Sequence, residues 1–301
     1  MKVSIYQIQY ANEIIGSFDP SFIKYDCRLN PENEKREIAH MQNFFDEGMW
    51  KNNASQYFGL VSPKFNEKTK LSGYEFIKWI NDNPGYDAYF INPFPQLRYF
   101  HFNVWEQGEY WHPGLLERAD FLFKSACMDV QTAKLPRNSN NTLLYSNYWV
   151  ANERFWQKFM EFVCALTSSL DRLENKDQKE FFALAPHYAV ATFYPFIFER
   201  MFSTFLSIDK SFRCLPYPYE KDVLLTRCTN DLERLIVNDW SELIDKWDAD
   251  NRSDYEIRKV FANLEDMQKL FLNRSSKVES LTNSSRGRWS QLNLLIRKYL
   301  A

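Results

Sequence analysis

Glycine is scarce in this chain, at 8 of 301 residues, or about 3 % where an average protein has about 7 %. The glycine-rich motifs that cradle phosphate groups, G-x-G-x-x-G and G-x-x-x-x-G-K, do not occur in the sequence, and neither does the nucleophile elbow G-x-S-x-G. The chain therefore lacks the usual signatures of Rossmann dehydrogenases, P-loop enzymes and serine hydrolases.

Cysteine is also sparse. Five cysteines lie far apart in the sequence and form no C-x-x-C pair. The four histidines form no H-x-x-x-H pair. This pattern predicts neither a disulfide framework nor a zinc site, and it favours a reducing compartment.

The chain has no excess charge of one sign and no long apolar run. Its 37 Lys and Arg residues nearly balance its 39 Asp and Glu residues, for a net charge of −2, so we expect no nucleic-acid partner. No stretch reaches 18 apolar residues, and the first residues are too polar for a signal peptide. We therefore expect a cytoplasmic protein.

Aromatic residues are abundant, with 9 Trp, 17 Tyr and 26 Phe. A chain of this length buries about 75 % of its unfolded surface when it folds, and so many aromatic side chains exclude a disordered protein. The composition predicts one large domain or a domain with an appended lobe.

The first half of the chain has the pattern of an α/β fold. Residues 3–8 are expected to form a strand and residues 34–49 a helix. Residues 57–61 then indicate a buried strand, a capping box of Ser72 and Glu75 begins a helix, and residues 87–91 indicate a second strand. Such a βαβ unit predicts parallel strands.

Ligands of α/β folds bind beyond the carboxyl ends of the strands. In this sequence those ends are Ser62-Pro63-Lys64 and Asn92-Pro93-Phe94. Ser62, Lys64 and Lys68 could together receive an anion such as a diphosphate, or the two lysines could simply belong to a solvated loop.

The later part of the chain is expected to be mostly helical. Residues 115–126 and 153–170 predict helices, residues 142–146 a strand, and almost everything from residue 178 onward is helical in pattern. We place the boundary of the α/β half near residue 175. Within the second half, Glu199 and Arg200 either lock a helix to the α/β half, which we favour, or reach the ligand.

The densest polar and aromatic run covers residues 103–114. It is expected to be either a packed surface loop or a site loop at the carboxyl edge of the sheet. Glu106, Gln107, Glu109 and His112 lie there among aromatic rings, which suits a carbohydrate ligand. A hydrolase using the two glutamates as its carboxylate pair is less favoured, since three-residue spacing in a loop does not fix their separation.

Residues 147–152 follow an expected strand, and they are interpreted either as a second site loop or as aromatic packing at the end of that strand. Together with the segments already described, they occur in a recognisable order: residues 57–65 with Lys68-Thr69, 87–93, 105–109 with 112–114, 147–152 and 199–203. In this order and spacing the chain resembles glycosyltransferase-like proteins of the GT-A type from bacterial capsule and lipopolysaccharide gene clusters. The resemblance covers residues 1–205.

The resemblance implies a GT-A-like (Rossmann-like) mixed sheet flanked by helices, with a nucleotide-sugar-binding domain at residues 1–175 and a mostly helical region at 176–301. The implied activity is that of a hexosyl- or pentosyltransferase. It would move a sugar from a nucleotide-sugar, in the first place a UDP-sugar, to a glycan or lipid-linked glycan of the bacterial surface. The alternative is a non-catalytic carbohydrate-binding or scaffolding protein of a polysaccharide assembly complex.

The resemblance also implies site residues. Those expected to bind the nucleotide-sugar are Ser62, Lys64, Lys68, Asn92, Asn103, Gln107, Asn147 and Tyr148. Those expected to be catalytic are Glu106, Glu109 and His112, with one glutamate as the base.

Many GT-A enzymes hold Mg²⁺ or Mn²⁺ on the diphosphate with a D-x-D pair. Here Asn92-Pro93-Phe94 stands where the pair is expected and has no carboxylate, so we assign no metal ligands. Lys64 and Lys68 are the expected substitutes for the cation.

The last segment, residues 286–300, has a basic side and an apolar side. From Arg274 onward the chain carries six basic residues against one acidic residue, Glu279. The segment is expected either to lie on an anionic inner-membrane surface, as a peripheral contact, or to dock on the protein's own core.

Overall fold

The computed structural model describes residues 2–10, 18–29, 32–49, 56–186 and 190–275. Its strands are β1 (Val3–Gln9), β2 (Ile23–Asp26), β3 (Tyr57–Val61), β4 (Ala88–Phe90), β5 (Trp149–Ala151) and β6 (Cys214–Pro216). Its α-helices are α1 (Glu37–Asp46), α2 (Phe65–Thr69), α3 (Gly73–Asp82), α4 (Val104–Trp111), α5 (Leu115–Ser125), α6 (Glu153–Asp171), α7 (Asn175–Phe181), α8 (Phe193–Glu199), α9 (Met201–Ile208), α10 (Lys221–Arg227), α11 (Asp231–Ala249) and α12 (Tyr255–Ser275). Three short 3₁₀ helices are η1 (Asn33–Lys35), η2 (Pro95–Tyr99) and η3 (Thr132–Lys134).

The six described strands form one mixed sheet in the order β2-β1-β3-β5-β4-β6. Strand β1 pairs in parallel with β2 and β3, and β4 pairs in parallel with β6. Strand β5 is antiparallel to both of its neighbours, β3 and β4. The prediction of a mixed sheet flanked by helices is therefore confirmed.

Strands β3 and β4 are not neighbours, which corrects the simple βαβ prediction. Strand β5 lies between them, and it is formed by residues expected to be a loop, whereas residues 142–146 form no strand. Only three residues long and buried throughout, β5 shows no readable alternation. Because β3 and β4 are both antiparallel to β5, they still point the same way, and their carboxyl ends share one edge of the sheet.

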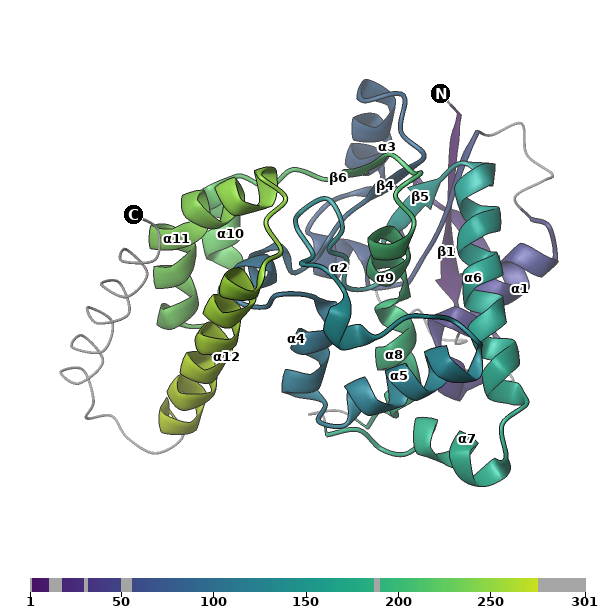
Figure 1. Cartoon of the computed structure of the whole chain (residues 1–301). Helices are drawn as coiled ribbons and strands as arrows, with labels where there is room; N and C mark the ends of the chain where they lie inside the picture. The colour runs from purple at the N-terminus through teal and green to yellow at the C-terminus, as the bar shows by residue number, and fades with distance from the viewer. Residues whose placement is uncertain (1, 11–17, 30–31, 50–55, 187–189, 276–301) are drawn as a thin grey trace.

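Two layers of helices cover the two faces of the sheet. Alternate side chains of a strand point to opposite faces, so Phe58 and Leu60 pack with α1, α6 and α9, whereas Tyr57 and Val61 pack with α2 and α3. In Figure 1 the long helix α6 runs beside β1, and α10, α11 and α12 gather at the other end of the molecule.

The helices α10 to α12 form a third apolar cluster together with η2. Tyr99, Phe100 and Phe102 of the segment after β4 are buried there against Trp240 and Phe261. Strand β6 adds to the sheet from beyond residue 175. The division of the chain at that residue stays a prediction, and both the sheet and the core continue past it.

The run at residues 103–114 is mostly helix α4, so the expectation of a loop is wrong. The Asn103 side chain begins the helix, because its Oδ1 accepts hydrogen bonds from the N–H groups of Trp105 and Glu106, each at 3.0 Å. Trp105 and Trp149 belong to the two runs for which a site loop was one of the expectations, and they are core residues with 0 % and 1 % exposure.

Among the described residues, no helix is both long enough and apolar enough to cross a membrane. The basic segment 286–300 lies outside the described residues. Its contact with a membrane or with the protein's own core stays a prediction.

Candidate functional site

Polar side chains meet at the carboxyl edge of the sheet, and we call this group the edge cluster. Its members are Glu37, Ser62, Lys68, Ser146, Asn147, Tyr148 and Glu199. They come from the start of α1, the end of β3, α2, the chain entering β5, and the end of α8. Because β5 is antiparallel, its first residues lie at the same edge as the last residues of β3.

The topology explains why a site forms at this edge. From β1 the chain goes first to β2 on one side, and later returns to β3 on the other side. Open α/β sheets bind ligands at such a switch point, beyond the carboxyl ends of the strands. The Gln7 amide in β1 donates to the carbonyl oxygen of Pro63, at 3.4 Å, and joins the two strands at this point.

Direct hydrogen bonds connect the edge cluster. The hydroxyl oxygens of Ser62 and Tyr148 lie 3.0 Å apart. The Lys68 ammonium donates to Ser146 Oγ at 3.2 Å and lies 6.0 Å from the centre of the Tyr148 ring. Asn147 Nδ2 donates to Glu37 Oε2 at 3.4 Å.

Ser146 has a left-handed backbone conformation, with φ of +63°. Both its N–H and its hydroxyl donate to Glu199 Oε1, at 2.8 Å and 3.2 Å. A non-glycine residue in this region costs of the order of 1 kcal/mol or more, and such strain gathers at functional sites. Glu199 thus holds the chain in the conformation that presents Asn147 and Tyr148.

The charges of the edge cluster act on Glu37. Burial raises the pKa of its carboxyl, and the Glu199 carboxylate acts in the same direction. The Lys68 ammonium and hydrogen bonds from Asn147 and Ser62 act in the opposite direction without cancelling the rise. Burial likewise raises the pKa of the Tyr148 hydroxyl, which therefore stays protonated at neutral pH.

One buried polar atom of the cluster and one beside it lack hydrogen-bond partners within the described structure. They are Asn147 Oδ1 and the hydroxyl of Tyr145, on residues that are only 4 % and 3 % exposed. A buried polar group without a partner costs about 1–3 kcal/mol. A ligand that carries hydroxyl groups could supply the missing partners.

The structure brings four of the expected site residues together, namely Ser62, Lys68, Asn147 and Tyr148. Asn92 lies nearby at the end of β4: its neighbour Ile91 donates a backbone hydrogen bond to Tyr148 at 2.9 Å. The Asn92 side chain accepts from the N–H of Phe94 at 3.0 Å and shapes the turn. Lys64 is exposed just before α2.

The other expected site residues, all on or beside α4, have structural contacts. The Glu109 carboxylate accepts from the N–H groups of Gly114 and Leu116, at 2.8 Å and 3.0 Å, and so caps α5. His112 Nδ1 lies 2.9 Å from the carbonyl oxygen of Pro186. The imidazole ring of His112 also stacks on Phe196, with ring centres 3.8 Å apart.

Glu106 turns toward α12 and forms an ion pair with Arg258 at 2.5 Å. The Asn103 side chain caps the start of α4. These contacts of Asn103, Glu106, Glu109 and His112 involve no member of the edge cluster, so the expected roles of the four residues in binding and catalysis stay predictions.

Arg200 ties α4 to the helices that carry Glu199. Its guanidinium donates to the carbonyl oxygens of Val104 and Phe196, at 2.8 Å and 2.5 Å, and to Gln107 Oε1 at 2.6 Å. The expected role of this pair, to lock its helix to the first half of the chain, is confirmed for Arg200. Glu199 instead belongs to the edge cluster. Gln107 thus contacts Arg200, and its expected role in nucleotide-sugar binding stays a prediction.

Sequence reasoning missed Glu37 and Ser146, and it placed Glu199 in a structural role. The Glu199-Arg200 pair was a usable signal, since two charges in an apolar helix require partners. For Glu37, an acidic residue in the first turn of a helix is common, so the sequence offers nothing that separates it from other glutamates.

The residues at the ends of β3 and β4 do not fit a divalent metal. Strand β3 ends in Ser62-Pro63-Lys64 and β4 in Asn92-Pro93-Phe94, neither of which carries a carboxylate. In the described part of the chain, no group of three or more His, Cys, Asp and Glu side chains could hold a metal ion. Near Glu37 and Glu199 the cation is the ammonium of Lys68.

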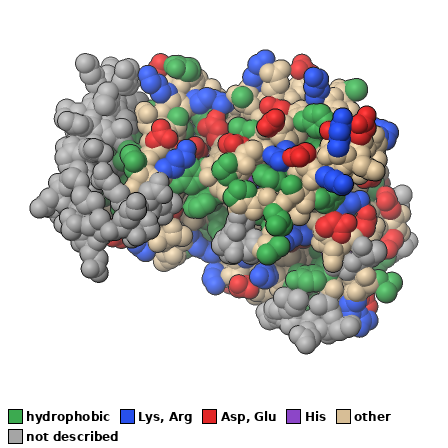
Figure 2. All heavy atoms as spheres, turned by 90° about the horizontal axis from the view of Figure 1, so that it is seen from below, with side chains coloured by type: hydrophobic (Ala, Val, Ile, Leu, Met, Phe, Trp, Pro, Cys, Tyr) green, Lys and Arg blue, Asp and Glu red, His purple; other side chains and the backbone are tan. Residues whose placement is uncertain are grey.

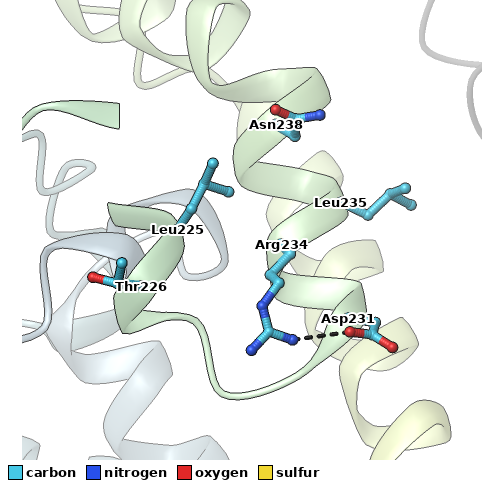
Figure 3. Close-up of a pocket in the computed structure, with 6 residues that line it drawn as sticks. All are labelled: Leu225, Thr226, Asp231, Arg234, Leu235 and Asn238. Atoms are coloured by element: carbon cyan, nitrogen blue, oxygen red, sulfur yellow. Dashed lines mark hydrogen bonds and ion pairs between the residues drawn. The ribbon is translucent and has the colours of Figure 1, made fainter. Parts of the chain in front are cut away.

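A pocket of a different kind lies between α10 and α11. Its lining residues are Leu225 and Thr226 on α10 and Asp231, Arg234, Leu235 and Asn238 on α11 (Figure 3), and Arg234 is paired to Asp231 at 2.9 Å. It contains no residue of the edge cluster.

On the face seen in Figure 2, acidic and basic side chains are interspersed without a large patch of one sign.

Comparison with known proteins does not identify a family for this chain. No protein-family model matches the chain, and no curated protein matches it in sequence. One solved structure that matches is described as the apo form of the bifunctional glycosyltransferase WbbM, with a TM-score of 0.39 and 14 % sequence identity. The match covers 72 % of this chain and 44 % of that one. A likeness at this level carries no argument about function.

Proposed function

We propose that this chain is a glycosyltransferase that takes a sugar from a nucleotide-sugar donor and uses the edge cluster as its site. The observation that carries this proposal is the convergence of the cluster on the switch point of the sheet, with the acceptor atom of Asn147 and the hydroxyl of Tyr145 buried and unpaired.

The side chains of the cluster suit the two parts of such a donor. Hydroxyl and amide groups of Ser62, Tyr148 and Asn147 can both donate to and accept from sugar hydroxyls. Lys68, with the exposed Lys64 at the start of the same helix, offers positive charge for a diphosphate. Since the strand ends do not fit a metal, these lysines are the groups that would stabilise the leaving diphosphate.

The resemblance noted in the sequence supports a more specific assignment. It points to a UDP-sugar as donor and to a glycan or lipid-linked glycan of the bacterial surface as acceptor. It covers the segments that supply Ser62, Lys68, Asn147, Tyr148 and Glu199, which are five of the seven members of the edge cluster.

The missing D-x-D pair favours one alternative, a carbohydrate-binding or scaffolding protein without transfer activity. Such a protein would bind sugars or nucleotides at the edge cluster but would release no nucleoside diphosphate. Turnover therefore separates the two candidates, whereas binding alone does not.

Calorimetric titration with UDP, UDP-glucose, UDP-galactose and GDP tests the proposal directly. A charge-assisted hydrogen bond contributes about 1.5–3 kcal/mol, so we expect Lys68→Met to weaken the binding of UDP or its sugars by about tenfold or more. The matched control is Lys78→Met, an exposed lysine on α3, with an expected change below about twofold.

Two results would refute the proposal. One is the absence of turnover for every nucleotide-sugar in the panel, whether or not the protein binds it. The other is equal affinity of the Lys68→Met and Lys78→Met variants for UDP, since the ligand would then bind away from the edge cluster.

A further inference from the structure

Glu37 differs from the other glutamates considered for catalysis because it lies inside the edge cluster. It belongs to the first turn of α1, and its side chain is neither fully buried nor freely exposed. Asn147 Nδ2 donates a hydrogen bond to its carboxylate at 3.4 Å, so the carboxylate lies beside the unpaired Asn147 Oδ1.

From this geometry we propose that Glu37 is the catalytic base, which takes the proton from the hydroxyl group that attacks the sugar. The inference rests on the proposed function. It assigns the chemical step to a residue that the sequence pattern did not single out, in place of Glu106 and Glu109.

The proposed step is a single displacement. The acceptor oxygen forms a bond to the anomeric carbon while the bond from that carbon to the diphosphate oxygen breaks. The proton of the acceptor hydroxyl moves to the Glu37 carboxylate, and the electron pair of the broken bond leaves with the nucleoside diphosphate beside Lys68. One displacement at the anomeric carbon inverts its configuration.

The surroundings of Glu37 suit a base. The charged groups that face it are Lys68 from α2 and Glu199 from α8. Burial and the Glu199 carboxylate raise its pKa toward neutral pH, which makes the carboxylate a better proton acceptor. Lys68 acts in the opposite direction and opposes this rise of the pKa.

The neighbouring carboxylate of Glu199 is less suited, because its Oε1 already accepts two hydrogen bonds from Ser146. Asn147 adds a second function. Its amide donates to Glu37, and its unpaired Oδ1 can accept a hydrogen bond from another hydroxyl of the same ligand. The pair would therefore orient a sugar bearing neighbouring hydroxyl groups.

The experiment compares Glu37→Gln with Glu34→Gln, a matched change of an exposed glutamate one turn earlier in the chain. UDP release from UDP-glucose and UDP-galactose, with water as acceptor, gives the rate, and calorimetry gives the affinity for UDP. Loss of a catalytic base lowers a rate about 10²–10⁴-fold. We expect that loss for Glu37→Gln, with UDP affinity within about threefold of the parent, and parental behaviour for Glu34→Gln.

Two further measurements do not depend on the folding of the Gln variant. Glu37→Asp keeps the carboxylate and should retain more activity than Glu37→Gln. For the parent protein, the rate of UDP release should fall on acidification with an apparent pKa above the ordinary glutamate value of about 4.3. Proton NMR should show that the sugar first released from the α-linked donors is the β anomer.

Parental turnover by Glu37→Gln, first release of the α anomer, or an acid limb at or below the ordinary glutamate value would each overturn the inference. None of these results would affect the proposed function. If the parent protein releases no UDP from either donor, whether or not it binds nucleotide, the proposed transfer function fails, and the inference about Glu37 fails with it.

Discussion

Replacing Gly108 by alanine tests whether α4 is held against Arg200 as tightly as the structure indicates. At an exposed helix position this change stabilises a protein by up to about 1 kcal/mol, because alanine favours helix. At Gly108 a Cβ atom would lie 2.3 Å from Leu115 Cδ2, 2.5 Å from Arg200 Nε and 2.9 Å from Arg200 Cζ. The expected sign is therefore reversed.

Neither neighbour can move freely. Leu115 is fully buried and Arg200 is 2 % exposed, and the hydrogen bonds of Arg200 to Val104 and Gln107 fix its guanidinium. Overpacking costs about 1–3 kcal/mol, and loss of a hydrogen bond to a charged group adds about 1.5–3 kcal/mol. After subtraction of the helix-propensity gain, we expect Gly108→Ala to lower the free energy of unfolding by about 2–5 kcal/mol.

Urea unfolding followed by tryptophan fluorescence measures this change. Gly85→Ala is the matched control: its φ is +100°, but a Cβ there meets no atom within 4 Å, so only backbone strain of about 1–2 kcal/mol is expected. If Gly108→Ala were as stable as the parent protein or more stable, α4 could not pack against Arg200 in this way, and the support of the edge cluster through Glu199 would need another explanation.

Two further changes test the electrostatics of α4 and the start of α3. Burial raises the pKa of Glu106 to about 7, although Arg258 opposes the shift. Protonated Glu106 therefore stabilises the folded state, and this contribution is complete below the unfolded-state pKa of about 4.3. It is lost as the pH rises through 7. The free energy of unfolding should fall by at most about 4 kcal/mol over that interval. Glu106→Gln should flatten the fall in urea titrations from pH 5 to pH 8, and an unchanged slope would contradict the assignment. Ser72→Ala removes the capping box with Glu75 and should lower the free energy of unfolding by about 1 kcal/mol. Ser125→Ala, at a partly exposed serine at the end of α5, should change it by less than about 0.5 kcal/mol. Equal effects in thermal unfolding would show that the cap contributes nothing.

Elements with a strong local signal could be predicted from the sequence. The helix at residues 153–170 has a long apolar face, and α3 begins at a capping box, so the structure confirms both. Strand β5 could not be found because its three residues are buried on both sides. Helix α4 was missed because Gly108 and a run of aromatic residues hide its period, although Asn103 was a usable cap signal.

The site could be predicted only in part. Ser62 and Lys68 follow a strand that the sequence shows clearly, so their place at the sheet edge could be reasoned out. Glu37 reaches the edge cluster through Asn147, 110 positions later in the chain. Such a contact depends on the order of the strands in the sheet, which a single sequence does not contain.

The position of the antiparallel strand β5 between β3 and β4 affects the order in which the protein folds. Ser62 meets Tyr148 across 86 positions, and Ser146 meets Glu199 across 53. Contacts between residues so far apart in the sequence form slowly, because closing the loop between them lowers the entropy of the chain before any hydrogen bond stabilises it. A nascent chain that has been synthesised only as far as β3 and α3 would contain Lys64 and Lys68 but not the complete edge cluster. The proposed nucleotide binding should therefore appear only late in refolding, after the whole sheet has formed, and not when the early helices form.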